Sequence, residues 1–123
     1  MVSHVVIIWA KDPSKDVEII LDGAAKLLED IPGVEAFHAG QMYPTDRPVV
    51  DKTYHVALNM QFQSMEDLAT YQKHPKHVEF VENYLKPNLE KLLVYDFNSW
   101  GFFVEGKLYL VGKNMSYSIW IRF

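Results

Sequence analysis

The sequence contains no cysteine, no basic run and no long apolar run, and each absence excludes a class of protein. Without cysteine the chain has no disulfides, no thiolate metal site and no cysteine nucleophile. The formal net charge is −4 and the 12 Lys and Arg residues form no cluster, so we expect no nucleic-acid partner. The apolar run near the start, residues 5–10, is too short to span a membrane and lacks the basic segment of a signal peptide. We therefore expect no membrane association and a cytoplasmic location.

What the chain has in quantity is apolar surface, since 49% of its 123 residues are hydrophobic and 14% are aromatic. That is enough for one small domain with its own core. The patterns predict the following elements in order: a strand over residues 4–10 that is buried on both faces, a helix over 17–28, strands over 34–42 and 54–63, a short helix opened by Ser64, a helix from Pro75 to about residue 87, and a strand over 92–97. This β-α-β-β-α-β order is the split βαβ arrangement of ferredoxin-like α+β folds.

Such a fold covers only one face of its sheet with helices, so the other face needs a partner. The first strand carries Val5, Ile7 and Trp9 on that second face. Left in water, these side chains would form a large apolar patch. We therefore predict a homodimer in which two sheets pack face to face.

The segment with the most chemical potential is Tyr71-Gln-Lys-His74-Pro75-Lys-His77. Proline fixes φ and has no N–H, so Pro75 ends one helix and begins the next. His77 lies at helical spacing from Phe80, Val81 and Tyr84, which predicts one inward-facing stripe. A side chain that titrates near neutral pH is thus directed at the core.

Several stretches resemble the stress-responsive A/B barrel (Dabb) domain family, whose members are dimeric α+β barrels. The matching pieces cover nearly four fifths of the chain in the right order: residues 2–6 (Val-Ser-His-Val-Val), 31–34 (Ile-Pro-Gly-Val), Tyr54, 62–64 (Phe-Gln-Ser), 74–78 (His-Pro-Lys-His-Val) and 91–97 (Lys-Leu-Leu-Val-Tyr-Asp-Phe). The resemblance implies a homodimeric barrel over residues 1–97. It implies no single activity, because a fold does not fix its chemistry.

One branch of that family, the plant olivetolic acid cyclases, closes a linear polyketide by aldol chemistry. The resemblance would assign its catalytic tyrosine and histidine to Tyr71 and His77, and one cavity residue to His4. Two other residues of the cyclase pocket fall on Val56 and Ala24 here, so the resemblance does not extend to the whole pocket.

The parity of the strands predicts a cavity between sheet and helices. In the third strand Tyr54, Val56 and Leu58 face one way. If the helix-facing set of the first strand is His4, Val6 and Ile8, as the resemblance implies, then two histidines and a tyrosine converge on one apolar space. The expected ligand-binding residues are His4, Val6, Ile8, Leu58, Phe80, Leu92 and Val94.

Three functions fit this prediction. The first is binding of a small, largely apolar molecule in the cavity. The second is a cofactor-free cyclase or isomerase-like enzyme, with His77 and Tyr71 as catalytic base and hydrogen-bond donor. The third is a non-enzymatic oligomeric stress-response protein in which His77 is a structural core histidine.

We expect no cofactor and no metal, since the histidine spacings match no zinc pattern. The related monooxygenases and haem-degrading barrels would use a helix histidine or an Asn/Trp/His set. Trp9 and His77 are present, but the first strand has no asparagine, which disfavours that alternative.

Residues 98–123 extend past the end of the family resemblance and form a separate C-terminal β segment in our prediction. They hold seven of the 17 aromatic residues of the chain, far too many for a disordered tail. Alternation and turn residues such as Glu105-Gly106 predict two or three strands. We expect them to add to a sheet edge or to cross to the partner subunit.

Overall fold

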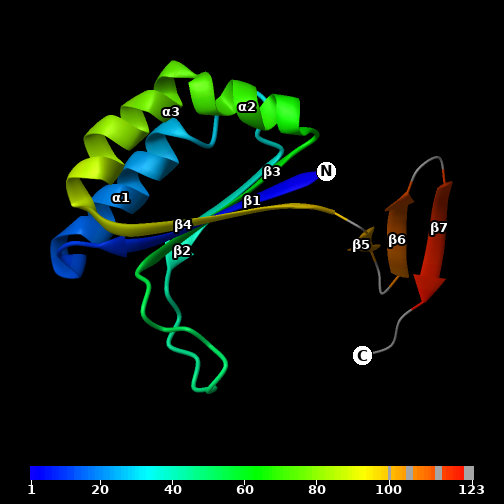
Figure 1. Ribbon diagram of the computed structural model, residues 1–123, viewed down its shortest axis with the longest axis horizontal. Helices are drawn as coiled ribbons and strands as arrows, with labels where there is room; N and C mark the ends of the chain where they lie inside the picture. The colour runs from blue at the N-terminus through cyan, green and yellow to red at the C-terminus, as the bar shows by residue number, and fades with distance from the viewer. Residues whose placement is uncertain (100, 105–106, 113–114, 121–123) are drawn as a thin grey trace.

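The computed structural model describes residues 1–99, 101–104, 107–112 and 115–120. The main body is a four-stranded antiparallel sheet with the strand order β2-β3-β1-β4. Its elements are β1 (Val2–Ala10), α1 (Pro13–Leu27), β2 (Ala36–Gln41), β3 (Val56–Phe62), α2 (Met65–Lys73), α3 (Pro75–Phe80) and β4 (Leu89–Asn98). Figure 1 shows the helices on one side of this sheet. The predicted ferredoxin-like α+β fold is thus confirmed.

The core lies between the sheet and the helices because the strands alternate as predicted. In β3 the side chains of Val56, Leu58, Met60 and Phe62 are all buried. The register places Val6 opposite Leu58 and Ile8 opposite Val56, and side chains directly opposite share one face of a sheet. The helix-facing set of β1 is therefore His4, Val6 and Ile8, as expected.

Sequence-local signals set the helix ends. Ser64 caps α2 by accepting a hydrogen bond from the Asp67 N–H at 3.2 Å, the arrangement that its position predicted. His74 has an extended backbone and caps α3, with its Nδ1 accepting from the Lys76 N–H at 3.1 Å. Pro75 follows as the first residue of α3, which separates the two helices at the predicted junction.

The helix that begins at Pro75 does not remain an α-helix. It continues as a π-helical turn, η1 (Val81–Leu85), and then as a 3₁₀ turn, η2 (Lys86–Asn88). A π turn inserts one extra residue into the helix. The expected inward-facing stripe is retained, since Val81 and Tyr84 are both partly buried and pack against the core, with the Tyr84 ring beside Gly23 of α1. The π turn adds Leu85, which the stripe did not include, to the buried residues.

The sheet face away from the helices is only partly covered. Val5, Ile7 and Trp9 are half-buried in the single chain, so the expectation that β1 is buried on both faces is wrong without a partner. The β4 side chains that share this face, by register with β1, are Leu93, Tyr95 and Phe97. All three are exposed. The chain alone thus has an apolar sheet face open to solvent.

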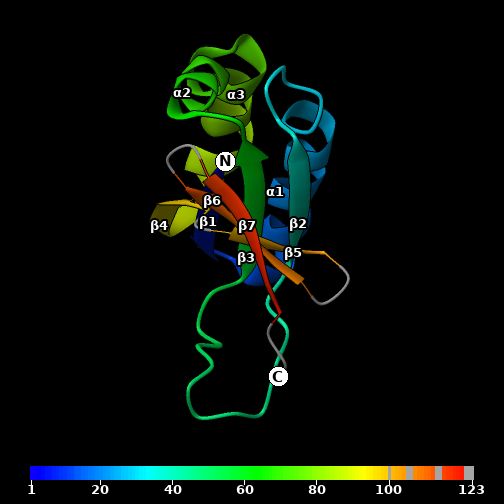
Figure 2. The same ribbon diagram turned by 90° about the vertical axis from the view of Figure 1, so that its right-hand side faces the viewer.

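Two further segments extend from this body. The connection between β2 and β3 is a long loop that projects away from the helices (Figure 2). After β4 the chain forms a separate three-stranded antiparallel sheet of β5 (Gly101–Val104), β6 (Lys107–Gly112) and β7 (Met115–Trp120).

The prediction of β structure in the C-terminal segment is confirmed. Of the two predicted arrangements, extension of an edge of the first sheet is wrong for the described strands, because they hydrogen-bond only with one another. A crossing to the partner subunit stays a prediction. The proposed turn at Glu105-Gly106 lies outside the described residues.

Candidate functional site

A largely apolar cavity lies between the inner face of the sheet and the helices α2 and α3. Its volume is about 220 Å³. Its lining residues are His4, Val6, Leu28, Leu58, Met60, Tyr71, Gln72, His77, Phe80, Val81, Leu85, Leu92 and Val94. Four of these carry polar side chains, and the rest are aliphatic, aromatic or thioether groups.

Most of the residues predicted from the sequence meet in this cavity. Its lining includes both proposed catalytic residues, His77 and Tyr71, and six of the seven proposed ligand-binding residues. The exception is Ile8, whose exposed fraction is 0% and which belongs to the packed core. Ile8 does lie on the predicted face, but beyond the end of the open space.

The structure adds five lining residues that sequence reasoning missed, namely Leu28, Met60, Gln72, Val81 and Leu85. Met60 could have been found, because it has the same parity as Leu58 in β3. Gln72 follows Tyr71 directly and lies at the edge of the cavity, where helix spacing alone does not distinguish it from solvent-facing neighbours. Leu85 depends on the π turn, which no local pattern signals.

Tyr71 and His77 form the polar centre of the site. Their ring centroids are 4.8 Å apart at an interplanar angle of 61°. Burial raises the pKa of the Tyr71 phenol far above its ordinary value, so the hydroxyl is a neutral hydrogen-bond donor at physiological pH.

His77 is also held in its neutral form. Burial is the larger influence and lowers the pKa of its imidazole, and the positive charge that His4 can carry acts in the same direction. The Gln72 backbone carbonyl opposes this shift. A neutral imidazole can accept a proton, which is the requirement for a general base.

His4 contributes a second imidazole that is fixed by a carboxylate. Its Nδ1 lies 2.5 Å from Oδ1 of Asp96, and β1 and β4 place these two residues directly opposite each other. Because a carboxylate only accepts, the His4 Nδ1–H donates, and Nε2 is the acceptor atom of the neutral ring. The His4 ring also packs edge-on against Tyr71 at 6.3 Å between centroids.

Asp96 was not among the residues that we expected at the site. In the sequence it is the one acidic residue of the predicted strand 92–97, and its pairing with His4 depends on the register of β4 against β1. The structure therefore adds a carboxylate that orients one of the cavity histidines.

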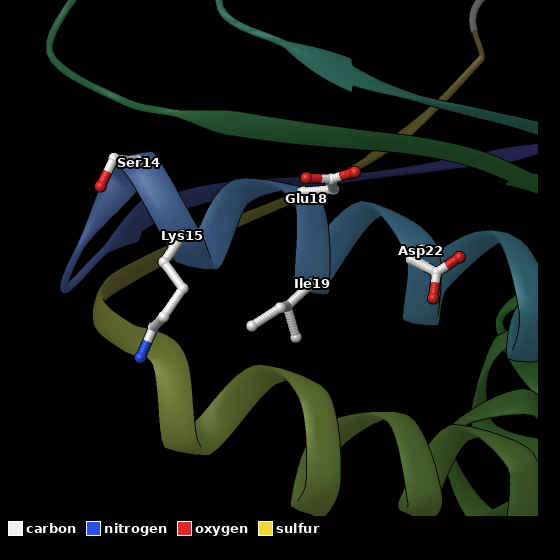
Figure 3. Close-up of a pocket in the computed structure, with 5 residues that line it drawn as sticks. All are labelled: Ser14, Lys15, Glu18, Ile19 and Asp22. Atoms are coloured by element: carbon white, nitrogen blue, oxygen red, sulfur yellow. The ribbon is translucent and has the colours of Figure 1, made fainter.

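A larger depression runs along the outside of the molecule but lacks the features of a ligand site. It has a volume of about 630 Å³ and is lined by Ser14, Lys15, Glu18, Ile19 and Asp22. Figure 3 shows that all five side chains come from α1. Each is exposed, so a ligand there would remain in contact with water.

No group of three or more His, Cys, Asp or Glu side chains in residues 1–99 and the three C-terminal strands is placed to hold a metal ion. Of the helices in that part of the chain, none is long and apolar enough to cross a membrane.

Comparison with known proteins places this geometry in a family. A stress-response A/B barrel domain-containing protein of Arabidopsis thaliana is 34% identical over 99 residues, which is 78% of this chain and 87% of the relative. A Dabb family protein of Mesorhizobium loti with a ferredoxin-like fold is 30% identical with a TM-score of 0.67, covering 80% of this chain and 95% of that one.

More distant structures share the fold alone. A dimeric ferredoxin-like protein of unknown function from Thermobifida fusca is 20% identical with a TM-score of 0.64, over 78% of this chain and 88% of that one. A hydroxynitrile lyase from Passiflora edulis is 22% identical with a TM-score of 0.62, over 78% and 90% of the two chains. The family model of the stress-responsive A/B barrel domain matches residues 2–99, and the chain therefore belongs to this family.

Proposed function

We propose that this domain binds a small, neutral and largely apolar molecule in the cavity between its sheet and helices. The observation that carries the proposal is the cavity itself, an apolar space in which His4, Tyr71 and His77 are three of the four polar lining residues. Binding sites for small molecules typically combine apolar walls with a few convergent polar groups.

Volume and charge limit the ligand. A dry cavity of about 150 Å³ holds benzene, so a volume of about 220 Å³ encloses a ring with a short substituent, on the order of nine or ten non-hydrogen atoms. The lining residues Leu92 and Val94 are 38% and 45% exposed, so the cavity opens to solvent beside β4. Burial opposes ionisation of both Tyr71 and His77. A neutral ligand with one carbonyl or hydroxyl oxygen matches these side chains, because the phenol donates and the imidazole accepts.

Acetophenone is a suitable probe because it has an aromatic ring, one carbonyl oxygen and a size near this limit. Titration calorimetry with the wild-type chain is expected to show saturable binding. His77→Ala is expected to weaken binding at least tenfold while the fold is retained. Val78→Ala is the matched control, since Val78 follows His77 in α3, is 48% exposed and does not line the cavity.

A thermal melt decides whether His77 has only a structural role. If His77→Ala lowers the melting temperature by several degrees and leaves acetophenone binding unchanged, His77 does not belong to the site. If the wild-type chain binds no neutral phenone at all, the binding proposal fails and a non-enzymatic, oligomeric role gains support.

A second candidate is proton-transfer chemistry without a cofactor, of the kind used by cyclases and isomerases. The observation that favours it is the His4–Asp96 hydrogen bond of 2.5 Å, which fixes one imidazole beside a second imidazole and a phenol. His77 would remove a proton from the carbon next to a carbonyl, and Tyr71 would donate a hydrogen bond to the enolate oxygen.

This candidate has a direct assay with the same probe. In D₂O the abstracted proton is replaced by a deuteron, so catalysis appears as deuterium incorporation into the methyl group of acetophenone, measured by NMR. His77→Ala should abolish the incorporation. Tyr71→Phe should slow it by about 100-fold or more, in line with the loss of one oxyanion donor, while acetophenone still binds. An exchange rate equal to that of buffer alone in the wild type rejects the catalytic candidate.

We also propose that the chain is a homodimer that pairs the open faces of two sheets. Leu93, Tyr95 and Phe97 on this face are 36%, 55% and 55% exposed, and the half-buried side chains of β1 continue the patch. The Thermobifida fusca protein of the same fold is described as dimeric. An ordinary interface of about 800 Å² per partner would cover this face.

A further inference from the structure

The wall of the cavity contains a π-helical turn, which is an uncommon element. Val81 and Leu85, the first and last residues of η1, both line the cavity. The hydrogen bond from the Lys86 N–H to the Val81 carbonyl closes the turn. Single π turns are frequently found at functional sites, and this one forms part of the wall of the candidate site.

The extra residue of η1 changes which side chain faces the cavity. An α-helix would place Tyr84 on the stripe of His77 and Val81, at the i+7 and i+3 positions. The π turn instead brings Leu85 to the cavity wall and turns Tyr84 towards α1, where its ring lies against Gly23. The side chain of Asn88 stabilises this geometry by donating a 2.7 Å hydrogen bond to the Tyr84 carbonyl.

Glycine is the only residue type at position 23 that leaves room for this ring. A Cβ on Gly23 would lie 2.4 Å from Cγ and 2.5 Å from Cδ1 of Tyr84, whereas ordinary contacts begin at 3.4 Å. Any side chain at position 23 therefore requires the ring to move by about 1 Å or more.

Phe80 links this contact to the cavity. The rings of Phe80 and Tyr84 are stacked, with 6.5 Å between centroids and an interplanar angle of 10°, and Phe80 lines the cavity. Because protein interiors are close-packed, a Tyr84 ring displaced from α1 pushes Phe80 towards the open space.

From these contacts we infer that the pair Gly23 and Tyr84 sets the upper size of the ligand, with the π turn as the device that holds Tyr84 out of the cavity. This inference rests on the proposed binding function and adds a specificity determinant that does not touch the ligand. It acts through the position of Phe80.

The test is a series of phenones with growing alkyl chains, from acetophenone to octanophenone, titrated calorimetrically against four chains. These are the wild type, Gly23→Ala, Gly23→Ala/Tyr84→Leu, and Gly40→Ala as the matched control. Gly40 lies in β2 on the open face of the sheet, opposite the side that holds the cavity. Apart from its chain neighbours, no atom of the described residues is within 4 Å of the position that its Cβ would take. Its substitution therefore changes a glycine without crowding any of these atoms.

The Gly23→Ala chain is expected to bind acetophenone as the wild type does and to lose the longest phenone that the wild type accepts. One methylene at the limit of an apolar pocket changes affinity by about tenfold or more, so the cut-off should shorten by at least one methylene. The double variant should restore or lengthen the cut-off, because leucine removes the displaced ring. Gly40→Ala should match the wild type.

Failure of this inference differs from failure of the proposed function. If the wild type binds no phenone, the binding function itself is refuted. If the wild type binds the series and Gly23→Ala has the same cut-off, Tyr84 has moved to solvent and the size-limiting role is wrong. If Gly23→Ala does not fold, Tyr84→Leu in the natural background decides: a longer cut-off supports the inference, and an unchanged one overturns it.

Discussion

The replacement Phe97→Ser tests the proposed dimer interface most sharply. Phe97 lies on the open face of the sheet, opposite Ser3 in the neighbouring strand, and is 55% exposed in the single chain. If the partner sheet covers this face, the exposed part of the ring is the apolar area that the interface gains from this residue.

The magnitude follows from that area. An aromatic side chain buries about 150–250 Å² when fully covered, so slightly more than half of it amounts to roughly 110 Å². At about 25 cal/mol per Å² this area is worth roughly 2.7 kcal/mol. A two-fold symmetric interface contains the residue twice, so loss of both rings costs about 5 kcal/mol, or roughly 10³- to 10⁴-fold in the dimer dissociation constant.

Sedimentation equilibrium over a dilution series measures this constant. The wild-type chain is expected to be a dimer at micromolar concentration and the Phe97→Ser chain a monomer with unchanged circular dichroism. Val78→Ser is the control, since Val78 is a comparably exposed apolar residue, at 48%, but belongs to the helix layer. Equal dissociation constants for the wild type, Phe97→Ser and Val78→Ser would show that this sheet face is not the interface.

Three further predictions concern the site and the domain boundary. Burial lowers the pKa of His77 below its ordinary value of 6.5, so as the pH falls the unfolded chain binds this proton before the folded chain does. The contribution of neutral His77 to the free energy of unfolding is therefore fully present above pH 6.5 and is lost as the pH falls below it. His77→Phe should reduce this fall in the free energy of unfolding, measured by denaturant titrations at pH 5–8, with His4, Asp96 and Tyr71 unchanged around it. An equally steep fall in the variant would contradict the lowered pKa of His77. Asp96→Ala leaves the His4 imidazole without its acceptor and should lower the free energy of unfolding by about 1–3 kcal/mol. An unchanged free energy of unfolding would show that water replaces the carboxylate. Truncation after residue 98 should leave a cooperatively melting dimer that still binds acetophenone, because β4 ends at Asn98. Loss of the dimer would instead assign the C-terminal sheet to the interface.

The sequence predicted the parts of the site that depend on local periodicity. Alternation in residues 56–62 determined which side chains of β3 face the helices, and the family resemblance, which implied the facing of the first strand, placed His4 and Val6 beside them. The Pro75 signal positioned His77 after a helix break. The alternation of β3 and the helix break follow from period 2 in strands and from the fixed φ of proline, so these two features could be derived without tertiary information.

The parts that could not be predicted depend on contacts between elements. Asp96 becomes the partner of His4 only through the register of two strands that are 92 residues apart in the chain. The exclusion of Ile8 from the cavity depends on how closely the helices approach the sheet. The exposure of the apolar face of β4 likewise follows from its position at the edge of the four-stranded sheet, which the order of elements alone does not specify.

The π turn shows why a sound local pattern can miss a residue of the cavity wall. Tyr84 and Leu85 are neighbours, and either could complete the apolar stripe that begins at His77. Leucine has no polar atom and suits the cavity wall, whereas tyrosine has a hydroxyl that favours a half-buried position, which it has here against α1. An α-helix would have to place the tyrosine inside. The extra residue of the π turn exchanges the two, and it is tolerated because Gly23 makes room for the ring and Asn88 satisfies the Tyr84 carbonyl. Two contacts that accommodate the π geometry thus come from residues 61 positions before and four positions after Tyr84, and the residues of the stripe alone do not reveal them.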